Sequence, residues 1–271
     1  MTSVEAPYDR YLRLLGISHV PAGVDGLRLL VLRHLIRVPF ENVSKLLLFG
    51  REGAGRALTL TEFLDGIEHR DLGGTCYLLN PYLADLLRAL GYKADLLGAD
   101  MTNPDVHTCI RVHLPPRAYH VDVGFAAPLR QPIPLDAFPH VITEGSHRYV
   151  LDKHLRGLAL TFQSDDEPPL SYVAHGPPRE FEYFTPVIRA SFAPEAYFLN
   201  RLRIARFFED YSVELLNRTM STHRGGATVT TEFATFAELE RAVHTEFALP
   251  RCPVRDAVAV LERHTGRPLF G

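Results

Sequence analysis

The sequence has few cysteines and lacks a long apolar run. Its three cysteines, an odd number without paired spacing, argue against a disulfide framework. The best apolar stretch, Leu29–Ile36, is interrupted by Arg33 and falls short of the roughly 18–20 residues that a membrane span needs. The first residues lack the basic start and following apolar run of a signal peptide. We therefore expect a soluble, cytoplasmic protein with no membrane partner.

The charge balance is close to neutral, with 29 basic and 32 acidic residues and a formal net charge of −3. Lysine supplies three of the basic residues, and the arginines are scattered without a basic run. Nucleic-acid binding relies on clustered positive charge, so we expect no nucleic-acid partner. The 271 residues, 46% of them hydrophobic, suffice for one large core or for several smaller ones.

The first third of the chain has the periodicity of helices. Apolar residues three to four positions apart predict helices over residues 8–15, 27–35 and 63–69, and a fourth helix between Gly73-Gly74 and Gly91. Thr59 or Thr61 is suited to cap the third helix, because a threonine oxygen accepts a backbone N–H of the first turn.

From about residue 92 the apolar residues alternate, as they do in strands. Strands are expected over residues 106–114, 119–123, 212–216 and 227–233, and helices from Thr235 and over Val254–His264. The order of helices, then strands, then both predicts an α+β fold, because parallel βαβ units would alternate from the beginning.

Cys76 is the leading candidate for a nucleophile. It opens a predicted helix after Gly73-Gly74-Thr75, where unpaired backbone N–H groups and the positive end of the helix dipole favour a thiolate. The glycines let the backbone pass close to a substrate, and N–H groups there can bind an oxyanion. The alternative interpretation is a small buried apolar side chain. Cys109, in mid-strand, and Cys252, before Pro253, are predicted to be inert.

The predicted hairpin of residues 106–123 can supply the imidazole and the carboxylate that a cysteine nucleophile requires. If its two apolar faces belong to one core, even-numbered residues of the first strand pair with odd-numbered residues of the second. His107 and Asp122 then share a side of the sheet. They are directly opposite only if the turn centres between Leu114 and Pro115. The alternatives are an ordinary strand histidine and an aspartate that accepts backbone hydrogen bonds.

The sequence shows no clear ligand set for a metal. His107, His113 and His120 form no tight pair, and the three cysteines are too dispersed for a zinc site, so we expect no metal. Dinucleotide-binding, P-loop and GxSxG patterns are absent as well.

Several segments in combination resemble the arylamine N-acetyltransferases. They are Pro39-Phe40-Glu41-Asn42, Gly73-Gly74-Thr75-Cys76 with Asn80, His107, Asp122-Val123-Gly124-Phe125, residues 129–135, Leu215-Leu216-Asn217-Arg218, Arg224-Gly225-Gly226 and residues 247–250. Their order and spacing fit the family, and the likeness spans nearly the whole chain.

The resemblance implies a fold of three parts. These are a helical bundle over residues 1–91, a β-barrel over residues 92–197 and an α/β lid over residues 198–271. It also implies a Cys–His–Asp triad of Cys76, His107 and Asp122, shared in geometry with papain-like proteases and transglutaminases.

The resemblance further implies an activity and its substrates. The family takes an acetyl group from acetyl-CoA onto the cysteine and then passes it to an arylamine or arylhydrazine. Acetyl-CoA, or another acyl-CoA, is therefore the expected co-substrate, and a small-molecule amine is the expected acceptor. Phe40 and Phe125 match family positions that line the acceptor cleft, and Gly124 is a further expected substrate-binding residue.

Some residues depart from the family pattern. Leu72 and Leu78 replace the usual Arg and Glu, which looks like the loss of a charge pair whose space an apolar pair could fill. Ala126 replaces a glycine, and Pro81 requires that its helix begin late or kink. The family's Ser-Thr-His-Pro segment is replaced around residues 190–194.

Four functions remain open, of which we expect the first. They are a CoA-dependent N-acyltransferase, an amide synthase that takes its acyl chain from an acyl carrier protein to form an amide or macrolactam, a hydrolase or transglutaminase-like enzyme, and a non-catalytic small-molecule-binding protein. The departures from the family pattern motivate the second. The last predicts that Cys76 is no more reactive than Cys109.

Overall fold

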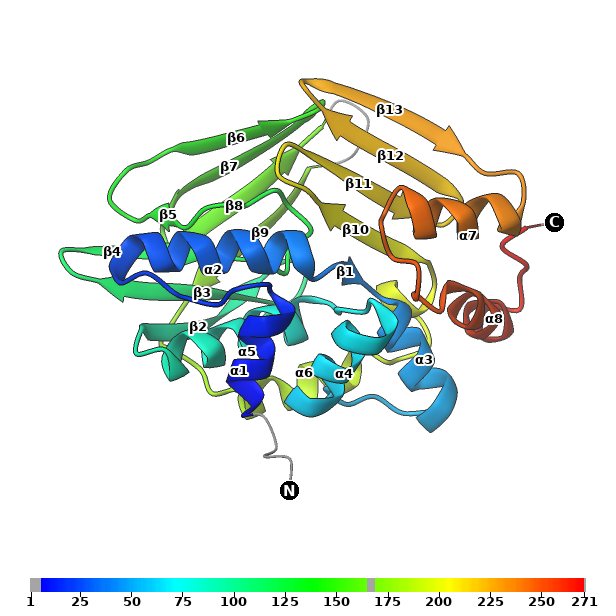
Figure 1. Ribbon diagram of the computed structural model, residues 1–271, viewed down its shortest axis with the longest axis horizontal. Coiled ribbons are helices and arrows are strands. Elements are labelled where there is room, and N and C mark those ends of the chain that lie inside the picture. Colours follow the sequence, from blue (N-terminus) through cyan, green and yellow to red (C-terminus); the bar gives the residue numbers. More distant parts are fainter. Residues whose placement is uncertain (1–5, 165–168, 271) are drawn as a thin grey trace.

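The computed structural model describes residues 6–164 and 169–270, and five helices occupy its first part (Figure 1). They are α1 Pro7–Leu14, α2 Gly23–Arg37, α3 Val43–Glu52, α4 Leu60–Arg70 and α5 Cys76–Ala89. The predicted helices are confirmed, and Thr59 caps α4 through reciprocal hydrogen bonds with Glu62. The sequence pattern did not reveal α3, because Leu46, Leu47 and Leu48 form a run instead of a helical period.

Eight antiparallel strands form a nearly closed, barrel-like sheet in the order β5-β4-β3-β2-β9-β8-β7-β6. They are β2 Lys93–Asp100, β3 His107–Leu114, β4 Arg117–Val121, β5 Ile133–Pro134, β6 His140–Glu144, β7 His147–His154, β8 Gly157–Gln163 and β9 Leu170–His175. Helix α5 packs against β2 and β3, and its leucine stripe of Leu79, Leu83, Leu86 and Leu87 is fully buried. This packing sets the start of α5 beside the start of β3.

A second sheet has the order β1-β10-β11-β12-β13. Its strands are β1 Phe40–Glu41, β10 Arg203–Phe207, β11 Tyr211–Leu216, β12 Thr219–Arg224 and β13 Ala227–Glu232. Helices α7 Phe236–Thr245 and α8 Val254–Thr265 lie beside it (orange and red in Figure 1). Because β1 comes from the first part of the chain, this sheet joins the two ends of the sequence. The α+β fold with helices, barrel-like sheet and α/β region is confirmed.

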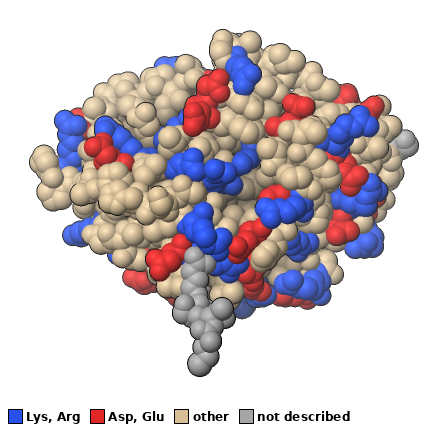
Figure 2. Space-filling view, viewed as in Figure 1, with Lys and Arg blue, Asp and Glu red and all other residues tan. Residues whose placement is uncertain are grey.

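A short helical segment connects the two sheets. It contains the 3₁₀ helices η1 Phe181–Phe184 and η2 Tyr197–Leu199 and, between them, α6 Thr185–Ala190. None of the helices in the described part of the chain is both long enough and apolar enough to cross a membrane. On the face drawn in Figure 2, basic and acidic side chains are interspersed.

Candidate active site

The segment that contains β1 positions the loop before Cys76. Phe40 forms a bridge with Gly74, and the buried Glu41 carboxylate accepts the backbone N–H of Gly73 at 3.0 Å and one from the first turn of α3 at 2.7 Å. Burial raises the pKa of Glu41, and these hydrogen bonds oppose the rise. A Cβ on Gly73 would lie 2.0 Å from a backbone carbonyl oxygen, so only glycine allows this close approach.

Cys76 is the first residue of α5, as expected, and is 7% exposed. Its carbonyl oxygen accepts the Thr108 hydroxyl at 2.9 Å, which ties the helix start to β3, and its Sγ lies 3.9 Å from the carbonyl oxygen of Val106. A Cβ on Gly124 would lie 2.7 Å from the Cys76 Cα. The thiol therefore lies at a helix start, where unpaired N–H groups favour negative charge, and is enclosed on two sides.

The β3–β4 hairpin brings His107 and Asp122 together. Ile110 pairs with Val121, so the expected pairing of even with odd residues is confirmed. The turn through Pro115-Pro116 is centred one residue beyond the position that would set the two side chains directly opposite, so they are diagonal neighbours. His107 Nε2 nevertheless lies 2.8 Å from Asp122 Oδ2, and both side chains are buried.

Asn80 of α5 orients the aspartate. Its Nδ2 donates to Asp122 Oδ1 at 2.8 Å and to the carbonyl oxygen of Thr108 at 2.5 Å, while its Oδ1 accepts the backbone N–H after Asp122 at 2.9 Å. The Gly124 N–H also donates to Asp122 Oδ1 at 2.8 Å. One carboxylate oxygen is therefore engaged by Asn80 and Gly124, and the other by His107.

The charges of the three side chains are coupled. Burial lowers the pKa of His107, but the Asp122 carboxylate and the hydrogen bond and charge of Cys76 raise that pKa further, so the net shift is upward. Burial raises the pKa of Asp122, but the His107 imidazole and Asn80 lower it more, so the net shift is downward. The geometry therefore favours an imidazolium–carboxylate pair beside the Cys76 sulfur.

Two aromatic rings pack on the His107 imidazole. The Tyr172 ring lies 4.6 Å away and the Phe125 ring 5.5 Å away, centroid to centroid, and the Tyr172 hydroxyl lies 2.8 Å from His120 Nε2. Of the expected substrate-binding residues, Gly124 and Phe125 thus lie at the site, whereas Phe40 is buried among core side chains. Tyr172 was missed, because it comes from a distant strand and no local pattern marks it.

The other two cysteines are in different environments. Both are buried and, like Cys76, carry a free thiol. Burial raises the pKa of Cys109 and of Cys252, so both thiols remain protonated. Among the described residues, neither thiol forms a hydrogen bond with a histidine side chain. This agrees with the expectation that both cysteines are inert.

The departures from the family pattern have specific structural consequences. Leu72 and Leu78 are buried in separate hydrophobic clusters, so the expectation that they fill one space together is wrong. Helix α5 includes Pro81 and still begins at Cys76, so it does not begin late. Ala126 has a φ of 58°, in the left-handed region where glycine would be unstrained.

Two groups of side chains in the described residues have ligand atoms close enough together for a metal ion. They are His147, Glu214 and His223, and Asp100, Asp105 and His175, with ligand atoms within 4.8 Å of one another in each group. Neither group includes Cys76, His107 or Asp122, so neither coincides with the candidate active site.

Comparisons with known proteins agree on one family. A family model described as N-acetyltransferase matches residues 23–251. A variant of the Mycobacterium smegmatis N-arylamine acetyltransferase has a similar structure, with a TM-score of 0.78 and 25% identity over 97% of this chain and 98% of that chain. The Mycobacterium marinum arylamine N-acetyltransferase, solved in complex with CoA, gives 0.78 and 25% over 94% and 96%.

A curated relative matches over a shorter range. The chicken (Gallus gallus) pineal gland arylamine N-acetyltransferase isozyme NAT-10 is 34% identical over 100 residues, which are 34% of this chain and 33% of that protein. The matched part therefore spans about a third of the length of this curated relative.

Proposed function

The chain belongs to the arylamine N-acetyltransferase family, and on that basis we propose that it transfers an acetyl or other acyl group from acyl-CoA, through a thioester on Cys76, to an aromatic amine or hydrazine. The observation that carries the proposal is the buried chain of contacts from Asn80 through Asp122 to His107, beside a cysteine at a helix start. A CoA thioester is the proposed donor because the Mycobacterium marinum relative binds CoA.

Before the first half-reaction the proton of the Cys76 thiol resides on His107, as part of the imidazolium–carboxylate pair, and the Cys76 thiolate then attacks the carbonyl carbon of the acyl thioester. Backbone N–H groups at the start of α5 are suited to stabilise the negative oxygen of the tetrahedral intermediate. The C–S bond to CoA then breaks, and the departing thiolate takes the proton from His107. The products are free CoA and an acyl group bonded to the Cys76 sulfur.

In the second half-reaction the acceptor amine attacks the acyl carbon. His107 takes a proton from the attacking nitrogen, the bond to the Cys76 sulfur breaks, and the sulfur leaves as thiolate, which the imidazolium stabilises. Water is the competing nucleophile. The packing of Tyr172 and Phe125 on the imidazole limits its access to the reacting atoms.

Asp122 and Asn80 are positioning residues in this mechanism. The carboxylate accepts the Nε2 proton of His107, which leaves the other ring nitrogen available for the thiol. Asn80 and the Gly124 N–H determine the orientation of the carboxylate. A carrier-protein donor, the alternative considered from the sequence, has no separate support among the described residues, and we do not adopt it.

The proposal is tested by the release of CoA from acetyl-CoA in the presence of aniline-type and hydrazine acceptors. We expect acceptor-dependent CoA release by the wild type and none by Cys76→Ala. Cys252→Ala is the matched control, because it removes a thiol that lies in the hydrophobic cluster of α7 and α8. Transfer that persists in Cys76→Ala would rule out the thioester, and a wild type that binds these compounds without turnover would support a non-catalytic binding protein.

A further inference from the structure

Lys45 is a partly buried cation beside the candidate active site, and no sequence pattern marks it. It lies in the first turn of α3, its Nζ donates to Ser191 Oγ at 2.6 Å, and the same Nζ lies 3.8 Å from the centroid of the Phe192 ring. Ser191 Oγ in turn donates to the carbonyl oxygen of Ile188 at 2.6 Å. Ser191 and Phe192 belong to the segment in which this chain departs from the family pattern.

The ammonium of Lys45 has no carboxylate counterion among residues 6–164 and 169–270, although the Cys76 thiolate places a negative charge near it. No carboxylate of these residues forms an ion pair with it, and Ser191 Oγ is its one hydrogen-bond acceptor there. An ammonium has three N–H groups to donate, so two of them remain for a ligand. A partly buried ammonium without a carboxylate partner is costly, and an anionic ligand that reached it would reduce that cost.

Lys45 lines a pocket that flanks Cys76. The pocket wall includes Thr75 and Tyr77, which flank Cys76 in sequence, and Leu78, two residues after it. Burial lowers the pKa of Lys45 to about 8, and the negative charge of Cys76 opposes this shift. With that pKa the amine is mostly protonated at pH 7.

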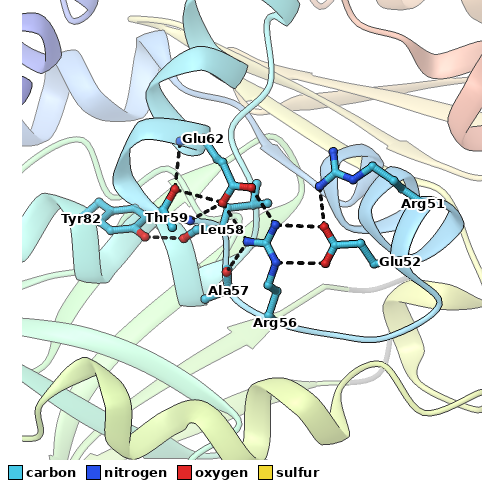
Figure 3. Close-up of polar contacts among 8 residues, drawn as sticks. All are labelled: Arg51, Glu52, Arg56, Ala57, Leu58, Thr59, Glu62 and Tyr82. Atoms are coloured by element: carbon cyan, nitrogen blue, oxygen red, sulfur yellow. Dashed lines mark hydrogen bonds and ion pairs between the residues drawn. The ribbon is translucent and has the colours of Figure 1, made fainter.

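The pocket has one other cationic side chain, Arg56, which is already neutralised. Figure 3 shows its guanidinium between two carboxylates, with Nε 3.0 Å from Glu52 Oε2 and Nη2 2.7 Å from Glu62 Oε1. These pairs fix the Arg56 side chain in the loop before α4. Lys45 is therefore the cation of the described pocket wall that remains available to a substrate.

We propose that Lys45 binds a carboxylate of the substrate, so that the pocket beside Cys76 selects a carboxylated substrate over its uncharged analogue. The carboxylate belongs either to the acyl group, as in the monothioester of a dicarboxylic acid, or to the amine acceptor, as in an aminobenzoic acid. This inference rests on the proposed function and adds a specificity-determining residue to it.

The test compares charged and uncharged partners of similar size. Malonyl-CoA is paired with propionyl-CoA, and para-aminobenzoate with its methyl ester. For each compound, kcat/KM and the dissociation constant are measured for wild type, Lys45→Met, Lys45→Arg and Lys153→Met. Lys153→Met is the matched control, because it removes one lysine charge from β7, at a distance in sequence and outside the pocket wall.

In Lys45→Met we expect the preference for the charged member of one pair to fall about tenfold or more, in binding and in kcat/KM. Lys45→Arg should retain part of that preference, and Lys153→Met all of it. The affected pair identifies whether the carboxylate is on the donor or on the acceptor. The proposal would be overturned if, for both pairs, the ratio between the charged and the uncharged member in kcat/KM and in dissociation constant were the same in wild type and in Lys45→Met. An absence of turnover with all four compounds and with acetyl-CoA and an aniline-type acceptor would refute the proposed function, while the dissociation constants would still decide the role of Lys45.

Discussion

Replacing Asp122 by asparagine should leave the fold intact and abolish most of the reactivity of Cys76. Asp122 Oδ1 accepts two N–H groups, from Asn80 and Gly124, each at 2.8 Å. The new side chain must therefore place its carbonyl oxygen at that position and its NH₂ group towards His107. An NH₂ group is only a donor, so His107 Nε2 must become an acceptor without a proton.

The tautomer of the imidazole determines the size of the effect. In Asp122→Asn the single ring proton of neutral His107 lies on Nδ1. This is the ring nitrogen that has to accept the proton of the Cys76 thiol. An Asp-to-Asn change with this consequence in a catalytic triad is worth about 10⁴ in rate, so we expect the acylation of Cys76 to slow by about 10³ to 10⁴. The free energy of unfolding should fall by about 1.5–3 kcal/mol, for one hydrogen bond to a charged group.

The assay follows the mass of the intact protein against time after mixing with acetyl-CoA, with circular dichroism to confirm folding. Asp95→Asn is the matched control, because Asp95 Oδ2 also lies 2.8 Å from a histidine, His113 Nε2, in a pair that does not include Cys76. We expect wild-type acylation in Asp95→Asn. A folded Asp122→Asn protein that is acylated within about tenfold of the wild-type rate would refute the reasoning on the tautomer.

Three further predictions follow from other contacts. Gly124→Ala places a methyl group 2.7 Å from the Cys76 Cα, so it should lower the free energy of unfolding in urea by about 1–3 kcal/mol and slow acylation. Gly66→Ala is the control and should do neither, because its Cβ would lie no closer than 3.4 Å to a neighbour. Glu41→Ala leaves two buried N–H groups unpaired and should destabilise by about 2–4 kcal/mol; a loss below about 1 kcal/mol would contradict that role. Burial lowers the pKa of His34 to about 3, so below about pH 6.5 only the unfolded chain takes up this proton. Between pH 7 and pH 4.5 the free energy of unfolding of the wild type should therefore fall by about 2.5 kcal/mol more than that of His34→Gln. Equal decreases would show that His34 does not cause the loss of stability.

Local sequence patterns predicted the parts of the site that depend on local structure. The helix start at Cys76 follows from the glycine pair and the leucine stripe, and the shared side of His107 and Asp122 follows from the alternation of apolar residues in the hairpin. The exact pairing did not follow, because the turn through Pro115-Pro116 can be centred at either of two positions without a change in the apolar pattern. The Asn80 contact with Asp122 could be suspected only from the family resemblance.

Contacts between distant segments were not predictable from the sequence. Tyr172 packs on His107 across 65 positions, and Ser191 reaches Lys45 across 146 positions. Neither pair leaves a periodic signal, because each depends on how the barrel-like sheet and the segment around α6 pack against the helices. The pairing of β1 with β10 escaped for the same reason, since two residues are too few to show a strand period.

The most direct test of the account is the mass of the intact protein after brief incubation with acetyl-CoA in the absence of any acceptor. We predict a gain of one acetyl group by the wild type, located on Cys76 by peptide mapping, and its loss when an arylamine is added. Cys76→Ala should show no gain, while Cys252→Ala should behave as wild type. If wild type gained no acetyl group, or if Cys76→Ala gained the same one, the thioester on Cys76 would be contradicted.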